Sequence, residues 1–223
     1  MTERPFWDWD WVFGHLDLIG QRLLEHVWLT SLAVVVGLLL SFPLAVAAFR
    51  SRWLLPPVTW VTGVLYTIPS LALFSLLIPF TGLSTLTAEI GLVSYTLLIL
   101  IRNIVAGLDA VPADVEEAAL GMGYTDRQLL WRVELPLALP VIIAGVRIAT
   151  VTTIGLVTVT ALIGKGGLGA LMLGGFRQLF PEIAVLVGVI LSVGLAVAAD
   201  GLLLAAQRTL TPWARSAGVR TAG

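Results

Sequence analysis

Residues 117–136 carry the sequence EAALGMGYTDRQLLWRVELP, the longest polar interruption between two long apolar segments of the chain. Within it, Glu117-Ala118-Ala119 is followed after three residues by Gly123, and nine further residues separate Gly123 from Val133. After one more residue comes Leu135-Pro136. Because the flanking apolar segments are long enough to cross a bilayer, the stretch at residues 112–136 is predicted to be a loop outside the membrane.

The composition of the whole chain also indicates a membrane protein. Hydrophobic residues make up 58% of the 223 residues and charged residues only 12%, whereas a soluble domain carries about 25% charged residues. The mean hydropathy is +0.97. A formal charge of −1 gives no indication of nucleic-acid binding, and the lack of cysteine excludes disulfides, thiolate metal sites and a cysteine nucleophile.

Five apolar segments reach the length of about 20 residues that a helix needs to cross a hydrocarbon core of about 30 Å. They are residues 26–49, 57–79, 86–106, 137–163 and 183–206. Helices are expected because an open strand would leave its backbone unpaired in lipid. The prediction is an all-α polytopic bundle of about five transmembrane helices over residues 26–207, with kinks at Pro43 and Pro69 that serve either packing or gating.

The distribution of Lys and Arg predicts the orientation, because cytoplasmic loops carry an excess of these residues. With the 112–136 loop inside, the cytoplasmic residues are Arg50, Arg52, Arg102, Arg127, Arg132, Arg208, Arg215 and Arg220. The external ones are Arg4, Arg22, Lys165 and Arg177. Eight against four predicts an external N-terminus and a cytoplasmic C-terminal tail at residues 208–223.

The segment before the first span, residues 1–25, is acidic and aromatic, unlike the basic start of a signal peptide. Its aromatic residues are Phe6, Trp7, Trp9, Trp11 and Phe13. Since Trp gathers at the membrane–water boundary, an interfacial segment on the outer face is predicted. A site for an aromatic or cationic ligand, the latter bound through cation–π contacts, is the alternative.

Local signals divide the 112–136 loop into two short helices. Asp114 is placed to cap the first, which Gly123 ends, and Asp126 is placed to cap the second. Ala118, Ala119 and Gly123 give a small-residue surface that a partner can approach closely. Leu129, Leu130 and Val133 give the second helix an apolar face. An ordinary amphipathic loop on the lipid surface would explain this face but not the fixed spacing of residues 117–136.

That spacing resembles the EAA loop of bacterial ABC-importer permeases, with Val133 where the family usually has Ile. In that family the loop forms two short cytoplasmic helices that dock into a groove of the ATPase subunit. The resemblance implies a type I permease fold with cytoplasmic coupling helices. It assigns the ATPase-coupling surface to Glu117, Ala118, Ala119, Gly123 and Pro136.

Residues 66–74, 145–151 and 161–169 further resemble the permease branch that imports quaternary-ammonium osmoprotectants such as glycine betaine, carnitine and choline. Lys165 departs from that branch, where a small residue is expected, and adds a positive charge near the predicted outer mouth. We expect Tyr66, Pro69 and Ser70 to lie near the translocation pathway.

The resemblance also implies partners. An external substrate-binding protein captures the ligand, two permease subunits (a second copy or a paralogue) form the pathway, and two ABC ATPase subunits bind and hydrolyse ATP. The chain itself is expected to sit in the bacterial inner or plasma membrane, among lipid, without a cofactor, a metal or a catalytic site. The alternatives are a methionine-type amino-acid importer and, from a different class, a stand-alone membrane carrier.

Two further features have competing explanations. Residues 164–169 match the dinucleotide pattern G-x-G-x-x-G, but they follow a membrane span rather than a strand, so we expect a tight external turn leading to Phe180-Pro181. Arg147 and Asp200 lie inside spans, about 15 Å and about 9 Å from the same side at 1.5 Å per residue. Similar depths predict an ion pair, either as a structural contact or as part of the pathway.

Overall fold

The computed structural model describes residues 9–177 and 182–214, and every regular element in these ranges is helical. The first half contains α1 (Trp9–Gly14), α2 (Leu16–Arg50), the 3-10 turn η1 (Arg52–Leu54), α3 (Leu55–Thr67), α4 (Ser70–Thr81) and α5 (Thr85–Asp109). The second half contains α6 (Ala113–Gly121), α7 (Asp126–Leu129), the π-helical turn η2 (Leu130–Glu134), α8 (Leu135–Val159), the 3-10 turn η3 (Thr160–Ile163), α9 (Leu168–Arg177) and α10 (Glu182–Leu210).

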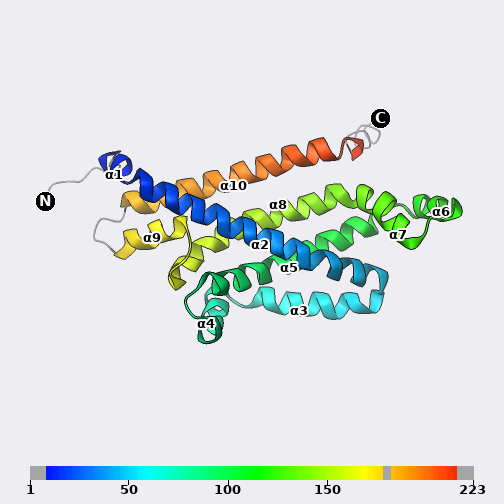
Figure 1. The fold of residues 1–223 in the computed structure, drawn as a ribbon, viewed down its shortest axis with the longest axis horizontal. Coiled ribbons are helices and arrows are strands. Elements are labelled where there is room, and N and C mark those ends of the chain that lie inside the picture. The colour runs from blue at the N-terminus through cyan, green and yellow to red at the C-terminus, as the bar shows by residue number, and fades with distance from the viewer. Residues whose placement is uncertain (1–8, 178–181, 215–223) are drawn as a thin grey trace.

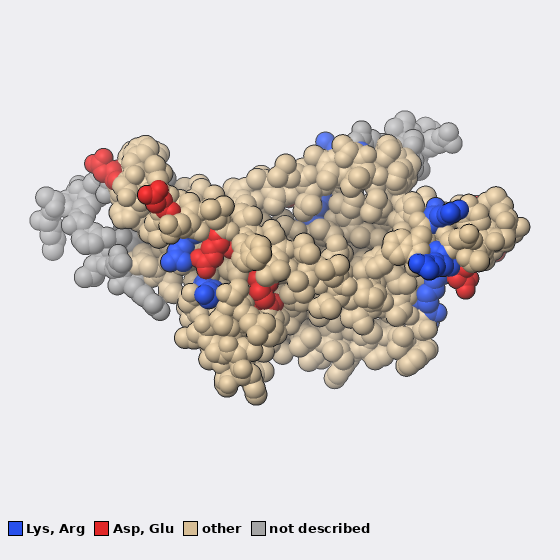
Figure 2. Space-filling view, in the orientation of Figure 1, with Lys and Arg blue, Asp and Glu red and all other residues tan. Residues whose placement is uncertain are grey.

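The long helices α2, α5, α8 and α10 run lengthwise through the molecule (Figure 1). At one end, which we call the loop end, lie α6 and α7; at the other, the α9 end, lie α1 and α9. The described chain begins at the α9 end and finishes at the loop end. On the face shown in Figure 2, most acidic and basic side chains gather near these two ends, and the middle carries few charged side chains. The arrangement matches a bundle whose middle lies in lipid.

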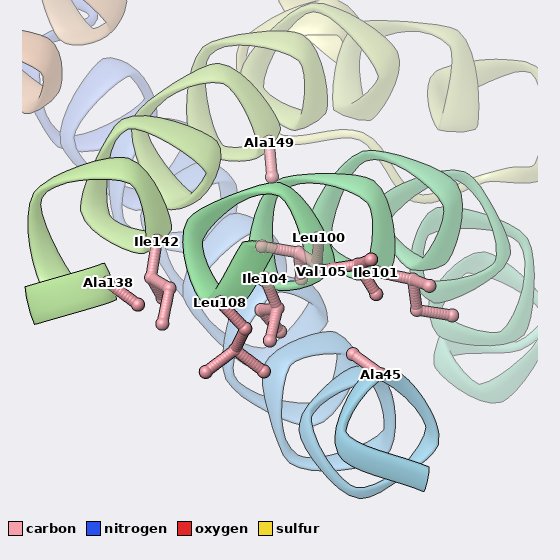
Figure 3. Packing of buried hydrophobic residues seen from close by; sticks show 9 residues of the cluster. All are labelled: Ala45, Leu100, Ile101, Ile104, Val105, Leu108, Ala138, Ile142 and Ala149. Carbon is pink, nitrogen blue, oxygen red and sulfur yellow. The ribbon is translucent and has the colours of Figure 1, made fainter. Parts of the chain in front are cut away.

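The core is built around α5, which packs between α2 and α8. Four α5 side chains with no exposed surface, Leu100, Ile101, Ile104 and Leu108, form one cluster with residues of α2 and α8 (Figure 3). The helices approach closely at small residues. A Cβ added to Gly145 of α8 would lie 2.3 Å from the Asn103 Cβ of α5. Close approach at glycine is typical of helix contacts in membranes, where packing supplies much of the association energy.

The prediction of about five membrane spans is confirmed, but the second span consists of two helices joined at a bend. In the described ranges, four helical segments are long and apolar enough to cross a membrane, and five spans result if α3 and α4 count as one. These two helices are bent by 96° at Ile68 and Pro69. Proline disfavours the helical conformation of the residue before it, and Ile68 accordingly is extended, with ψ 125°. Pro43, by contrast, does not break α2.

Several element boundaries differ from the hydropathy prediction. Helix α2 begins ten residues before the predicted span, so residues 16–25 of the expected interfacial segment continue the first long helix. The tight turn expected at residues 164–169 is present, with positive φ at Gly164, Gly166 and Gly167, but it leads into the ten-residue helix α9. Predictions that involve Arg4, Phe6, Trp7, Phe180-Pro181, Arg215 and Arg220 lie outside the described residues.

Candidate functional site

The 112–136 loop folds into two short helices, as expected, but with different caps. Helix α6 begins at Ala113 with Pro112 as its N-cap residue, so the prediction that Asp114 caps a helix from Val115 was wrong. Pro112 favours this start because its fixed φ suits the helix entrance and it has no N–H to satisfy. Asp114 lies in the first turn, where a carboxylate is favourable against the helix dipole.

Gly123 ends the first helix, as predicted. Its φ of +86° lies in the left-handed region, which a residue with a Cβ adopts only with strain. The amide of Tyr124 then donates to the carbonyl of Ala119 at 3.1 Å, and that of Gly123 donates to Leu120 at 2.9 Å. These bonds satisfy carbonyls that the helix end would otherwise leave open.

Thr125, rather than the expected Asp126, caps the second helix. The Thr125 hydroxyl accepts from the amide of Gln128, and the Gln128 side chain accepts from the amide of Thr125 at 2.9 Å. Such a capping box fixes the start of a helix from both sides. Helix α7 passes directly into η2 and then into α8, so the loop is joined to a long helix without an interruption.

The predicted coupling residues do not all face outward. Glu117, Ala118 and Gly123 are exposed, whereas Ala119 is 2% exposed and Pro136 is partly buried in the first turn of α8. Beside α7 there is a hollow of about 350 Å³ whose lining consists of Thr125, Arg127, Gln128, Trp131 and Arg132. The loop therefore offers both an exposed helix surface with an acidic residue and a basic hollow.

The structure adds charged residues that the sequence analysis did not single out as functional. At the last residue of α2, Arg50 Nη2 lies 2.6 Å from Glu134 Oε2 and 3.5 Å from the carbonyl oxygen of Asp126. Nearby, Arg52 Nη2 lies 2.6 Å from Asp109 Oδ1. The sequence could have drawn attention to Glu134 as a charged residue close to the start of an apolar span, but it gives no sign of its partner, which lies 84 residues away.

The residues predicted to lie near the pathway surround the break between α3 and α4. Tyr66 and Pro69 are exposed and Ser70 is partly exposed. The Tyr66 ring meets the ring of Tyr95 on α5 edge to face, with 5.7 Å between centroids. The Tyr95 hydroxyl donates to the carbonyl of Ile68, an acceptor that the break in the helix frees. Irregular backbone at membrane depth is tolerated where protein or water satisfies it.

Arg147 of α8 and Asp200 of α10 are brought together in a bidentate contact. Both nitrogen–oxygen distances, Nε to Oδ1 and Nη2 to Oδ2, are 2.8 Å. The side chains are 24% and 39% exposed and border a groove of about 600 Å³ between the two helices. Apart from Thr152, the rest of the groove lining is apolar, with residues such as Ile148 and Val151. The pair joins α8 to α10 inside the apolar part of the chain.

The glycine pattern at residues 164–169 serves internal packing. A Cβ on Gly167 would lie 2.6 Å from the backbone nitrogen of His26, and one on Gly166 would lie 2.3 Å from that of Ala161. The His26 ring accepts from the amide of Leu168 through Nδ1 at 3.3 Å. Nε2 therefore carries the proton and donates to the carbonyl of Ile154 at 3.0 Å. His26 thus joins α2, α8 and the start of α9.

Comparison with known families and proteins places these features in context. Residues 31–211 match the model of the family described as "Binding-protein-dependent transport system inner membrane component". The chain is 41% identical over 208 residues to the osmoprotectant import permease protein OsmW of Salmonella typhimurium, covering 91% of this chain and 96% of the relative. It is 35% identical over 188 residues to the choline transport system permease protein OpuBB of Bacillus subtilis, covering 84% of this chain and 86% of the relative.

Among solved structures, the fold is similar to a chain of the MetNI methionine ABC transporter in an inward-facing conformation. The TM-score is 0.80 at 21% identity, and the match covers 89% of this chain and 98% of the other. At this identity the likeness concerns the fold alone.

Proposed function

Because this chain belongs to the family of binding-protein-dependent transport system inner membrane components, we propose that it forms the pathway of an ATP-driven importer for quaternary-ammonium osmoprotectants. Membership makes it a permease subunit of an ABC importer, and its long apolar helices fit a multi-pass membrane protein. The proposal adds the substrate class, the partners and the orientation. Its permease domain would span residues 26–207, with residues 1–25 outside and residues 208–223 in the cytoplasm.

The observation that carries the substrate class is 41% identity, over almost the full length of both chains, to a protein described as an osmoprotectant import permease. A second relative, at 35% identity, is described as a choline transport permease. The methionine transporter shares 21% identity, which supports a common fold but no common substrate. Quaternary-ammonium import is therefore favoured over methionine import.

The loop supplies the surface for a separate ATPase subunit in this proposal. Glu117, Ala118 and Gly123 are exposed and would contact that subunit directly. Ala119 and Pro136 would act indirectly, because the Ala119 side chain is buried and Pro136 lies in the first turn of α8. ATP would be bound and hydrolysed by the partner, and the loop would carry the resulting motion into α8.

The pathway would lie between two permease subunits, a second copy or a paralogue, and would pass near Tyr66, Pro69 and Ser70. Support comes from the 96° break at this point, since broken helices at membrane depth commonly line binding sites and cavities in transporters. An external binding protein would deliver the ligand. The 112–136 loop would face the cytoplasm, in agreement with the excess of arginine on that side.

Uptake by the reconstituted importer tests the substrate class. The permease, its cognate ATPase and its external binding protein are placed in proteoliposomes with ATP inside. We expect ATP-dependent accumulation of labelled glycine betaine, carnitine or choline and none of labelled methionine. Accumulation of methionine, without any quaternary-ammonium compound, would refute the proposed substrate class.

Substitution of Glu117 by Arg tests the coupling surface. We expect Glu117→Arg to insert into the membrane normally but to lose both co-purification with the ATPase and uptake, because it reverses the charge of the exposed helix surface. The matched control is Asp10→Arg, the same change of charge at an exposed position of α1, at the α9 end. If Glu117→Arg keeps ATPase binding and uptake, the loop is not the coupling surface.

A further inference from the structure

We propose that the ion pair between Arg50 and Glu134 makes α2 part of the coupling apparatus, so that the end of α2 and the 112–136 loop move as one body. Arg50 and Glu134 are positioning residues in this proposal: they hold the loop against α2 and touch neither ATP nor substrate. The inference rests on the proposed function of the loop and adds a route by which its motion reaches a second membrane helix.

The first support is the burial of Glu134. Its side chain is 1% exposed, and Oε2 lies 2.6 Å from Arg50 Nη2. Its other oxygen, Oε1, is buried and has no hydrogen-bond partner among the described residues. A buried carboxylate is costly unless it is paired, so loss of the Arg50 contact would leave a charge with little compensation. Breaking the Arg50 contact while Glu134 stays buried is therefore unfavourable.

The second support is that one guanidinium holds two parts of the loop. Besides Glu134 at the end of η2, Arg50 Nη2 lies 3.5 Å from the carbonyl oxygen of Asp126 at the start of α7. The start of α7 and the end of η2 therefore both contact the Arg50 side chain. Relative rotation of α7 and η2 about the end of α2 would change both contacts at once.

The third support is apolar packing that continues the same interface. The Trp131 ring of η2 lies 6.0 Å, centroid to centroid, from the Phe42 ring, two turns before Arg50 on α2. Leu130 and Phe49 also pack against the core cluster that contains Ala45. Trp131 and Glu134, three residues apart in the π-helical turn, therefore both contact α2. π-Helical turns often occur at functional sites, where they redirect side chains.

A second ion pair at the same end provides a matched control. Arg52 and Asp109 join the turn after α2 to the end of α5 at 2.6 Å, but their side chains are 62% and 39% exposed. Exposed pairs contribute little because water screens them. Asp109→Asn removes the same charge as Glu134→Gln, at the same end of the bundle, without touching the 112–136 loop.

Distance measurement by electron paramagnetic resonance tests whether the two parts move together. The chain has no native cysteine, so Trp53→Cys and Met122→Cys, at exposed positions beyond α2 and in the loop, can be spin-labelled selectively. In the full complex in nanodiscs, we expect the distance between the two labels of one subunit to be narrowly distributed and not to change when ATP is added. Glu134→Gln should broaden the distribution or make it depend on ATP, and Asp109→Asn should not.

Transport stoichiometry tests the consequence for coupling. We expect Glu134→Gln to bind the ATPase normally. The amount of substrate imported per ATP hydrolysed should fall by a factor of about five or more, because a coupling interaction is lost. Arg50→Gln should behave alike, whereas Arg50→Lys, which keeps the charge, should recover part of the ratio. Asp109→Asn should keep the wild-type ratio.

The outcomes separate this inference from the proposed function. Suppose that Glu117→Arg loses ATPase binding, whereas Glu134→Gln keeps the wild-type stoichiometry and an unchanged distance distribution. This combination would overturn the role of the ion pair but not that of the loop. Retained ATPase binding in Glu117→Arg would overturn the function of the loop. If Glu134→Gln does not reach the membrane, Arg50→Gln decides the question by the same two measurements.

Discussion

Substitution of Gly145 by alanine should destabilise the contact between α5 and α8 that positions both flanks of the 112–136 loop. The new Cβ would lie 2.3 Å from the Asn103 Cβ and 2.8 Å from its Cγ. The Asn103 Cβ is fixed to the backbone, so the two helices must separate. The Asn103 side chain also donates to the carbonyl of Ile99 at 2.8 Å, which limits its movement.

The size of the effect follows from two opposing contributions. Alanine favours a helix over glycine by about 1 kcal/mol. Inserting a methyl group into a packed contact costs about 1–3 kcal/mol. Gly155, on the same helix, has no neighbouring atom within 4 Å of an added Cβ. Gly155→Ala should therefore gain the helix preference of alanine without the cost of overpacking. The two variants should differ by about 1–3 kcal/mol in unfolding free energy, with Gly145→Ala the less stable.

Thermal unfolding of the purified permease measures this difference. The eight tryptophans give a fluorescence signal, and circular dichroism follows the helices. For a protein of this size the predicted free-energy difference corresponds to about 2–12 °C between the two midpoints. Equal midpoints for Gly145→Ala and Gly155→Ala would refute the argument that glycine is needed at this crossing.

Two further predictions concern polar contacts between helices. Asp200→Asn should lower both the unfolding temperature and uptake, because Arg147 then lacks its carboxylate partner within the span; unchanged values for both would contradict a stabilising role of the pair. His26→Leu should destabilise the fold by about 1–3 kcal/mol, because the buried amide of Leu168 loses its acceptor. An unfolding midpoint equal to that of the wild type would show that the His26 contacts contribute no net stability.

The long helices could be predicted because lipid imposes a simple condition on them. A segment in the hydrocarbon core must satisfy its own backbone and remain apolar for about 20 residues, which hydropathy along the chain detects. The same regularity explains how a contact between Arg147 and Asp200 could be anticipated: both residues lie on long helices with a known rise per residue, so their depths can be calculated.

Features outside the long helices were harder to predict. Thr and Asp are both good N-cap residues, so the sequence alone does not show which of Thr125 and Asp126 caps the helix. The backbone angles decide it, and they place Thr125 at the N-cap. The contact of Arg50 with Glu134 depends on the path of a π-helical turn, for which the sequence carries no clear signal. Helix α9 is ten residues long, too short for the hydropathy criterion of a span.

Two of the ion pairs between elements, Arg50–Glu134 and Arg147–Asp200, indicate how motion spreads through the subunit. The loop continues into α8 through η2 without an interruption, so a shift of the loop moves α8 directly. Arg50 and Glu134 extend this shift to α2, and Arg147 and Asp200 extend it to α10. Three long helices are thus tied to one loop, and the core cluster packs α5 between two of them. Such connections favour rocking of the whole subunit over rearrangement inside it, as in other transporters that alternate access by rigid-body movement. The mobile boundary would then be the surface between two permease subunits rather than any boundary within one chain.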